Sequence, residues 1–186
     1  LLFAFVPQFG AEGVWVSVFT AISAFCNAGF DLFGRFGAYS SLVPYVNNYY
    51  VQAVIMFMIM AGGLGFMVWV ELAEYRKKRR LSLHAKVVLQ FSVIFWVGGA
   101  VLLALLEWSN PRTMGGLSVP GKIMAALFQS VSTRTAGMNT IDLAACSPIS
   151  KLLMSVLQFI GAAPGSTGGG VKVTTFAVLI PTIRSV

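Results

Sequence analysis

Long apolar runs alternate with short polar interruptions along this chain. Residues 51–70 and 87–106 each form an apolar window without a charged side chain. About 20 consecutive apolar residues are enough for an α-helix to cross the hydrocarbon core of a bilayer. We therefore predict spanning helices over about 45–72 and about 87–106, followed by a further apolar stretch over about 148–186.

Two shorter apolar segments have a different length and context. Residues 14–25 and 121–132 are too short to cross a bilayer, and their length suits re-entrant pore helices. Each leads into a small polar stretch, at 26–30 and at 133–138, which we interpret as a filter segment. A polar linker and a long apolar span follow in both cases. The order short helix, polar segment, spanning helix therefore occurs twice.

Matches between these segments indicate an internal repeat. Residues 19–23 match residues 128–132 in the pattern Phe-x-x-aliphatic-Ser. Ala28-Gly29 matches Ala136-Gly137. Self-similarity of this kind is typical of a repeated architecture. We predict an all-α integral membrane protein made of helix, re-entrant pore loop, helix units, as in potassium channels. The expected parts are a first unit over 1–74 with a truncated first helix, a cytoplasmic loop over 75–86 and a second unit over 87–186.

The last apolar stretch contains a segment that no regular helix can cross. Six of the ten residues from 161 to 170 are Gly or Pro, and these residues break helical geometry. Inside a membrane, irregular backbone is tolerated only where protein buries it or where it lines a water-filled path. We therefore predict a broken spanning helix over about 148–186, as part of a pore or carrier rather than a simple anchor.

Composition and charge place the chain in a lipid bilayer. Hydrophobic residues make up 57% and charged residues 10%, whereas about a quarter of residues are charged in soluble domains. The net charge of +7 does not indicate a nucleic-acid partner, because five basic residues form one run at 76–80. Such a run between two spans is typical of a cytoplasmic loop. We expect a multi-pass fragment of a longer cell-membrane protein, with both filter segments toward the outside.

No combination of residues in the sequence predicts catalysis. The only histidine, His84, has no carboxylate or cysteine nearby, and Cys26 and Cys146 lie too far apart for a metal-type cluster. A glycine-rich stretch precedes Lys172, but Val171 interrupts the Gly-Lys-Ser/Thr order of a phosphate-binding loop. We therefore expect neither an enzyme nor a cofactor in this chain.

The two polar segments have the chemistry of a cation filter. A pore that selects a dehydrated cation needs several oxygens at a narrow point, and backbone carbonyls supply them. Glycine permits the backbone angles that turn successive carbonyls inward, and the C-terminal end of a short helix adds partial negative charge. Two ordinary extracellular loops with glycine turns are the alternative. The candidate filter residues are Asn27, Ala28, Gly29, Thr135, Ala136 and Gly137.

Charged side chains near the filter segments need separate explanations. Arg134 lies within the second segment, where a cation facing the axis would oppose transport. We predict that it points behind the filter and supports it through hydrogen bonds or an acidic partner. Asp31, two residues after Gly29, is the best candidate for concentrating cations at the outer mouth. The acids predicted on the outer side, as mouth groups or as solvated loop charges, are Glu12, Asp31, Glu107 and Asp142.

Three motifs together carry a resemblance to a known family. Residues 23–34 resemble the second pore loop of the Trk/Ktr/HKT superfamily of cation transporters, and residues 132–140 resemble its third. Residues 164–172 resemble the intramembrane gating loop in the spanning helix that follows. The match covers nearly the whole chain and is closest to the bacterial Ktr/Trk potassium-uptake membrane subunit. The resemblance implies four pore units around a pseudo-fourfold axis, two of which are present here.

By the same resemblance, residues 161–170 form a gate below the filter. A glycine-rich segment can occupy a pore, offer carbonyls or hydroxyls, and move aside at modest cost. Lys172 either holds this loop or repels ions in the closed state, or else it extends to the cytoplasmic interface. The candidate gate residues are Gly165, Ser166, Thr167, Gly168, Gly169, Gly170 and Lys172.

The resemblance implies uptake of monovalent cations, above all potassium, through a carbonyl-lined filter. It also implies a homodimer and a cytoplasmic nucleotide-binding regulatory subunit. Three alternatives stay open: a sodium-preferring member of the superfamily, a carrier that alternates access around broken helices, and a structural membrane subunit without transport.

Overall fold

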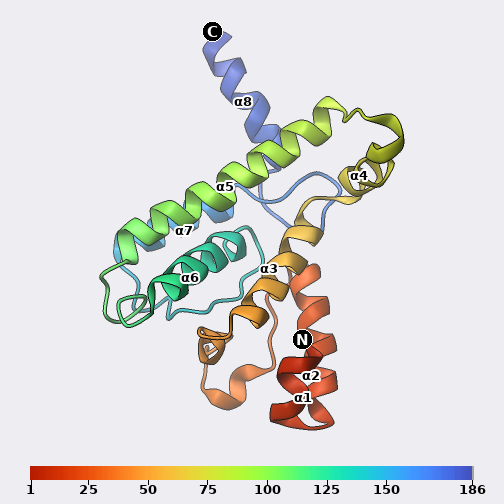
Figure 1. Cartoon of the computed structure of the whole chain (residues 1–186). Helices are drawn as coiled ribbons and strands as arrows, with labels where there is room; N and C mark the ends of the chain where they lie inside the picture. Colours follow the sequence, from red (N-terminus) through yellow and green to blue (C-terminus); the bar gives the residue numbers. More distant parts are fainter. Residues whose placement is uncertain (186) are drawn as a thin grey trace.

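The chain folds into helices joined by irregular loops, which confirms the predicted all-α class. The computed structural model describes residues 1–185, with side chains described for residues 1–179. Figure 1 shows α5 running along one side of the molecule, with α6 and α7 beside it and with α1 and α2 at the far end. The helices are α1 (Leu2–Phe9), α2 (Glu12–Phe25), α3 (Tyr49–Gly63), α4 (Phe66–Lys78), α5 (Leu83–Glu107), α6 (Val119–Ser132), α7 (Pro148–Phe159) and α8 (Val173–Ser185).

Helix α5 is the clearest membrane span. It contains 25 residues, and its most apolar window has a mean hydropathy of 2.2. At a rise of 1.5 Å per residue it is about 37 Å long, which exceeds the hydrocarbon thickness of a bilayer. The Ser82 hydroxyl accepts a hydrogen bond from the Ala85 amide and caps the helix N-terminus. The helix predicted over 87–106 therefore matches α5, which starts slightly earlier, and its crossing of a membrane stays a prediction.

The prediction of one continuous helix over 45–72 is wrong. The apolar stretch forms two helices, α3 and α4, which bend by 99° at a short break. Gly65 at this break has a φ of 84°, a left-handed conformation that stops the helix. The Trp69 indole nitrogen donates a hydrogen bond to the Ala61 carbonyl oxygen at 2.8 Å, across the bend. One of the carbonyls freed by the break thereby regains a partner.

The basic loop is shorter than predicted. Residues 75–78 continue α4 and residues 83–86 begin α5, so only residues 79–82 link the two helices. Lys78 lies one turn from Glu74 and forms an exposed ion pair with it at 2.6 Å. Arg79 ends α4 in a left-handed conformation with a φ of 51°. The positive run thus lies at a helix C-terminus, where cations are favoured by the helix dipole.

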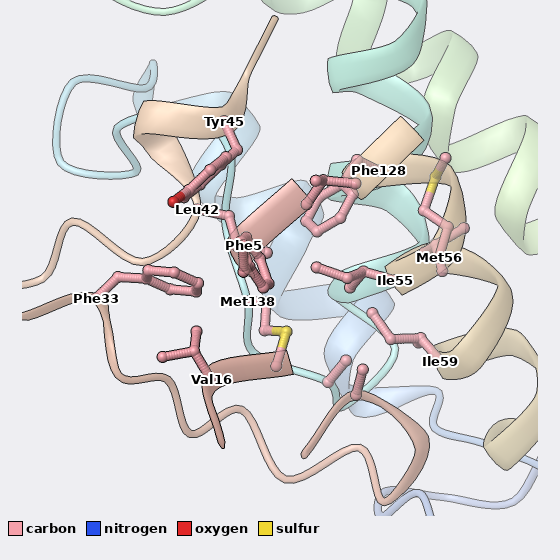
Figure 2. Packing of buried hydrophobic residues seen from close by; sticks show 14 residues of the cluster. Phe5, Val16, Phe33, Leu42, Tyr45, Ile55, Met56, Ile59, Phe128 and Met138 are labelled. Carbon is pink, nitrogen blue, oxygen red and sulfur yellow. The ribbon is translucent and has the colours of Figure 1, made fainter. Parts of the chain in front are cut away.

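One apolar core joins the two predicted units. Phe5 and Val16 from the N-terminal helices pack with Ile55 of α3, and all three belong to the same cluster as Phe128 of α6 and Met138 after it. Figure 2 shows these side chains pointing toward one another from separate elements. Because burial of apolar surface is the main favourable term in folding, this cluster fixes the two short helices α2 and α6 relative to each other.

Glu107 is buried, contrary to the expectation of an exposed acid on the outer side. It has no exposed surface at the end of α5. Its carboxylate accepts hydrogen bonds from Asn110 Nδ2 at 2.6 Å, Thr113 Oγ1 at 2.7 Å, Ser147 N at 2.9 Å and Ser150 Oγ at 2.5 Å. A buried carboxylate is tolerated when such donors surround it. Glu107 therefore ties α5 to the start of α7 and is unavailable to ions at a mouth.

Candidate ion filter and gate

The two filter segments leave the C-terminal ends of two short helices. Helix α2 ends at Phe25 and helix α6 ends at Ser132, so each segment begins at the C-terminal, partially negative end of a helix dipole. The predicted pore helices over 14–25 and 121–132 therefore match α2 and α6 to within two residues at either end. This placement favours a cation beside each segment.

The sign of the backbone φ angle alternates along both segments. Asn27 and Gly29 have φ values of 50° and 75°, and the matching Thr135 and Gly137 have values of 75° and 80°. The residue between each pair, Ala28 or Ala136, stays outside the positive-φ region. Alternation of this kind turns successive carbonyl oxygens toward one side of the chain. Non-glycine residues rarely adopt positive φ, so its recurrence at matching positions is strong support for the repeat.

The carbonyl oxygens of residues 27–29 and 135–137 are free to bind a ligand. Neither a backbone donor of residues 1–185 nor a side-chain donor of residues 1–179 reaches any of these six oxygens. Asn27 and Ala136 are buried whereas Ala28 and Gly137 are exposed, and each of these carbonyls can still accept a partner. A cation supplies that partner in filters built from main-chain oxygens.

A serine at the end of each pore helix holds the segment that follows it. The Ser23 hydroxyl donates a hydrogen bond of 2.6 Å to the carbonyl oxygen of Phe30. The Ser132 hydroxyl donates in the same way to the carbonyl oxygen of Met138. Both serines occupy matching positions of the sequence repeat, but the sequence alone did not indicate this role for them. Each bond closes a loop around one filter segment and fixes its curvature.

The two filter segments meet at their glycines. A Cβ atom built on Gly29 would lie 2.6 Å from the Ala136 carbonyl oxygen and 3.4 Å from the Gly137 Cα. A Cβ built on Gly137 would lie 3.5 Å from the Gly29 Cα. The structure thus brings all three central residues together, although they come from separate predicted units. Glycine is required at Gly29 both by its backbone angle and by this close approach.

The predicted gate is a folded loop between α7 and α8. Residues 160–172 are outside both helices, and Ile160 and Val171 pair in an isolated parallel bridge at the neck of the loop. The Ser166 hydroxyl donates to the Ala163 carbonyl at 2.5 Å. Lys172 Nζ donates to the Gly168 carbonyl at 2.8 Å. The sequence predicted that Lys172 either holds the loop or extends to the cytoplasmic interface. In the structure its ammonium group is bound to the loop.

The loop packs into the break between α3 and α4. The amides of Ala163 and Thr167 donate to the carbonyls of Gly63 and Gly62, at 3.0 Å and 3.2 Å. Carbonyls in the last turn of a helix lack partners within the helix, and here the loop backbone supplies them. Figure 1 shows the loop before α8 lying beside the junction of α3 and α4. Gly62 lies against both the loop and the end of α2, since a Cβ built there would lie 2.7 Å from Thr167 Oγ1 and 1.8 Å from the Phe25 carbonyl oxygen.

The loop also contacts both filter segments. The Thr167 hydroxyl donates a hydrogen bond to the Phe25 carbonyl at 2.8 Å and accepts one from Asn27 Nδ2 at 2.8 Å. The Gly169 amide donates to Thr135 Oγ1 at 3.1 Å. One side chain from each filter segment is thus bonded to the loop. No pattern in the sequence indicated these contacts, because they join residues that are far apart along the chain.

Arg134 lies behind the second filter segment and is almost fully buried. Its Nη2 donates a hydrogen bond of 2.5 Å to the Gly161 carbonyl at the start of the loop. Its guanidinium carbon lies 5.4 Å from the Phe95 ring centroid and 6.0 Å from that of Trp96. Both rings belong to α5 and offer cation–π contacts. Arg134 is thus hydrogen-bonded to the loop, and no acidic partner for it is found in the described part of the chain. Support of the filter by Arg134 stays a prediction.

The other predicted outer charges are engaged locally. Asp31 Oδ1 accepts a hydrogen bond from the Phe33 amide at 2.9 Å and so begins a short 3₁₀ turn. Glu12 forms an exposed ion pair with Arg35 at 2.5 Å. Asp142 accepts from the Ala144 amide at 2.8 Å. A role for Asp31 at an outer mouth stays a prediction.

The chain matches one protein family over nearly all of its length. Residues 4–185 match the family TrkH, described as a cation transport protein. The potassium/sodium uptake protein NtpJ of Enterococcus hirae is 39% identical over 95% of this chain. The Ktr system potassium uptake protein B of Vibrio alginolyticus is 41% identical over 96% of it. The chain spans 38% of the length of the first relative and 39% of the second.

A solved structure has the same fold. The potassium transporter TrkH of Vibrio parahaemolyticus superposes with a TM-score of 0.68 and covers 91% of this chain at 20% sequence identity. The chain corresponds to 38% of that protein. This likeness shows the overall fold of the chain.

Proposed function

Because this chain belongs to the TrkH family of cation transport proteins, we propose that it carries two pore units of a potassium uptake transporter. The observation that supports this proposal most strongly is the pair of facing segments at 27–29 and 135–137, whose carbonyl oxygens have no protein donor among the described residues. Main-chain oxygens at a narrow point can replace the hydration shell of a cation. The names of the relatives, which include potassium and sodium uptake, agree with a monovalent cation as substrate.

Residues 161–170 act as the gate of this pathway in the proposal. Support comes from hydrogen bonds of the loop to Asn27 and Thr135, one in each filter segment. The loop lies outside α7 and α8, so it can move without unfolding either helix. Arg134 and Lys172 hold its two ends through carbonyl hydrogen bonds.

The proposed protein is a multi-pass component of the cell membrane. The basic run at 76–80 faces the cytoplasm, because positive charge beside membrane spans is retained there, and the filter segments then open toward the outside. Four pore units complete the pathway, and the working form is a homodimer with a cytoplasmic nucleotide-binding regulatory subunit. The name of the Vibrio alginolyticus relative, a part of a Ktr system, supports an assembly of several components.

Uptake measurements with the complete transporter test this function. The protein is expressed in cells that lack their own potassium uptake systems, and growth at limiting potassium is compared with growth without the protein. The proposal expects rescue by the intact protein and inhibition of rubidium uptake by potassium more than by sodium. Stronger inhibition by sodium would establish the sodium-preferring alternative, and absence of any cation uptake by correctly inserted protein would refute the proposal.

A further inference from the structure

A small cavity lies behind the two filter segments. Its volume is about 10 Å³, and its lining includes Ile59, Trp96 and Val131 together with two polar residues, Asn27 and Arg134. Both polar residues are more than nine-tenths buried, with exposed fractions of 8% and 5%. Asn27 belongs to the first filter segment and Arg134 to the second. The cavity is thus bordered by one polar group from each segment.

Asn27 offers an acceptor that the protein does not use. Its orientation is fixed by Thr167: the hydroxyl donates to the Phe25 carbonyl, so its oxygen must accept from Asn27 Nδ2. The Asn27 Oδ1 atom is left buried and without a hydrogen-bond partner in the described structure. An unpaired buried acceptor costs about 1–3 kcal/mol, which makes a ligand at this atom favourable.

Arg134 offers a matching donor. Its Nη2 is bonded to the Gly161 carbonyl, but its Nε is buried and has no acceptor among the described residues. Arginine stays protonated, so this Nε always carries a hydrogen. One unused acceptor and one unused donor therefore belong to the two polar residues that line the same small cavity.

We propose that this cavity binds one ordered water molecule, which accepts from Arg134 Nε and donates to Asn27 Oδ1. A metal cation is unsuitable here because the guanidinium of Arg134 would repel it. An anion is unsuitable because it cannot donate to Asn27 Oδ1. Water satisfies both groups, and a cavity of about 10 Å³ is the least that holds one molecule.

The water links the filter segments at a point away from the ion path. Asn27 is then fixed on one side by Thr167 of the loop and on the other by Arg134, which is itself bonded to Gly161 at the neck of the loop. Asn27 and Arg134 become positioning residues: they set the angles of the carbonyls at 27–29 and 135–137 without touching the ion. The effect of this water on ion selection rests on the function proposed above, whereas the binding of the water does not.

A density map of the complete transporter tests the water directly. At a resolution that shows buried waters elsewhere in the protein, we expect one peak within hydrogen-bond distance of both Asn27 Oδ1 and Arg134 Nε. A map that shows other buried waters and leaves this cavity without a peak overturns the proposal. This result is independent of whether the protein transports potassium.

A double-mutant cycle tests the link in function. Asn27→Gly keeps the left-handed backbone and removes the amide, and Arg134→Lys removes Nε while keeping the charge. If the water joins them, their effects on the potassium-to-sodium uptake ratio are not multiplicative, and the coupling is about threefold or more. The control pair is Thr20→Val with Arg134→Lys, since Thr20 also has a buried, unpartnered hydroxyl among the described residues. Its effects should multiply within about twofold, and equally multiplicative effects in the Asn27 cycle contradict the link.

Discussion

Gly29 faces Ala136 so closely that a methyl group at Gly29 would lie 2.6 Å from the Ala136 carbonyl oxygen. This contact joins two segments from separate repeats, and both carry the same alternation of backbone hand. Two matching loops that merely turned in solvent would have no reason to meet. Their convergence favours the proposed shared filter over a pair of ordinary glycine turns.

The first prediction concerns this contact. Gly29→Ala places a side chain in a left-handed conformation, which costs about 1–2 kcal/mol, and against a carbonyl of the other segment. We expect potassium uptake to fall by about tenfold or more, since 1.4 kcal/mol corresponds to tenfold in rate. The matched control is Gly98→Ala in α5, where an added Cβ meets no atom within 4 Å. Equal uptake by the two variants in membranes would argue against a filter at Gly29.

The second prediction concerns closure of the loop. Thr167→Val removes the hydrogen bonds to Phe25 and Asn27, each worth about 1 kcal/mol. We expect cation flux to rise by about threefold to tenfold, because the closed position loses its attachment to the filter. Deletion of residues 163–169 should raise flux further. Thr175→Val, at an exposed position of α8, serves as the matched control, and unchanged or reduced flux in inserted Thr167→Val protein would contradict a gate.

The third prediction concerns Arg134. Arg134→Lys keeps the charge but cannot reproduce the planar donor geometry or the contacts with the Phe95 and Trp96 rings. We expect thermal stability in detergent to fall and selectivity for potassium over sodium to weaken together, because the side chain supports the filter from behind. Lys151→Arg, at an exposed position of α7, should leave both quantities unchanged. Loss of stability with wild-type selectivity would confine Arg134 to folding.

The fourth prediction separates a structural carboxylate from the ion path. Glu107→Gln weakens a buried site that holds four donors. Hydrogen bonds to charged groups contribute about 1.5–3 kcal/mol, so we expect the free energy of unfolding to fall by about 2 kcal/mol while ion selectivity stays constant. Glu74→Gln, in an exposed ion pair, should change neither. A shift in selectivity without a loss of stability would indicate that Glu107 acts on ions at the outer mouth.

The fifth prediction uses the two thiols. Burial raises the pKa of the Cys146 thiol to about 11, with the nearby Glu107 carboxylate adding to the effect, whereas Cys26 is exposed. The reactive form is the thiolate, and a raised pKa means that little thiolate exists at pH 8. Maleimide should therefore label Cys26 in preference to Cys146, and labelling of Cys146 should increase only as the pH approaches 11. Single Cys26→Ala and Cys146→Ala variants assign each signal, and fast labelling of Cys146 at pH 8 would show that the loop before α7 is open.

Hydrophobic length and glycine placement were sufficient to predict much of the architecture. The uncharged run at 87–106 predicted α5. The short apolar runs before Ala28-Gly29 and Ala136-Gly137 predicted α2 and α6. The density of Gly and Pro at 161–170 predicted the break between α7 and α8. These features depend on local backbone preference and on the thickness of the bilayer, so they can be predicted from the sequence.

The bend at Gly65 could not be predicted in this way. Residues 51–70 are as apolar as a spanning helix must be, and glycines such as the three at 62, 63 and 65 are tolerated in many membrane helices. The positive φ of Gly65 ends the helix, and the loop at 161–170, far along the chain, stabilises this end by supplying donors to the carbonyls of Gly62 and Gly63. Burial of Glu107 and the bonds of Thr167 are long-range contacts of the same kind. Tertiary contacts decide all three, and periodicity carries no information about them.

Density for a bound cation tests whether residues 27–29 and 135–137 form an ion filter. The complete transporter is imaged after potassium has been replaced by rubidium, whose anomalous scattering identifies it. The account predicts a rubidium peak beside the contact of Gly29 with Gly137, coordinated by main-chain oxygens of residues 27–29 and 135–137. A map with these carbonyls directed toward bulk water, and with the rubidium bound elsewhere, would contradict it.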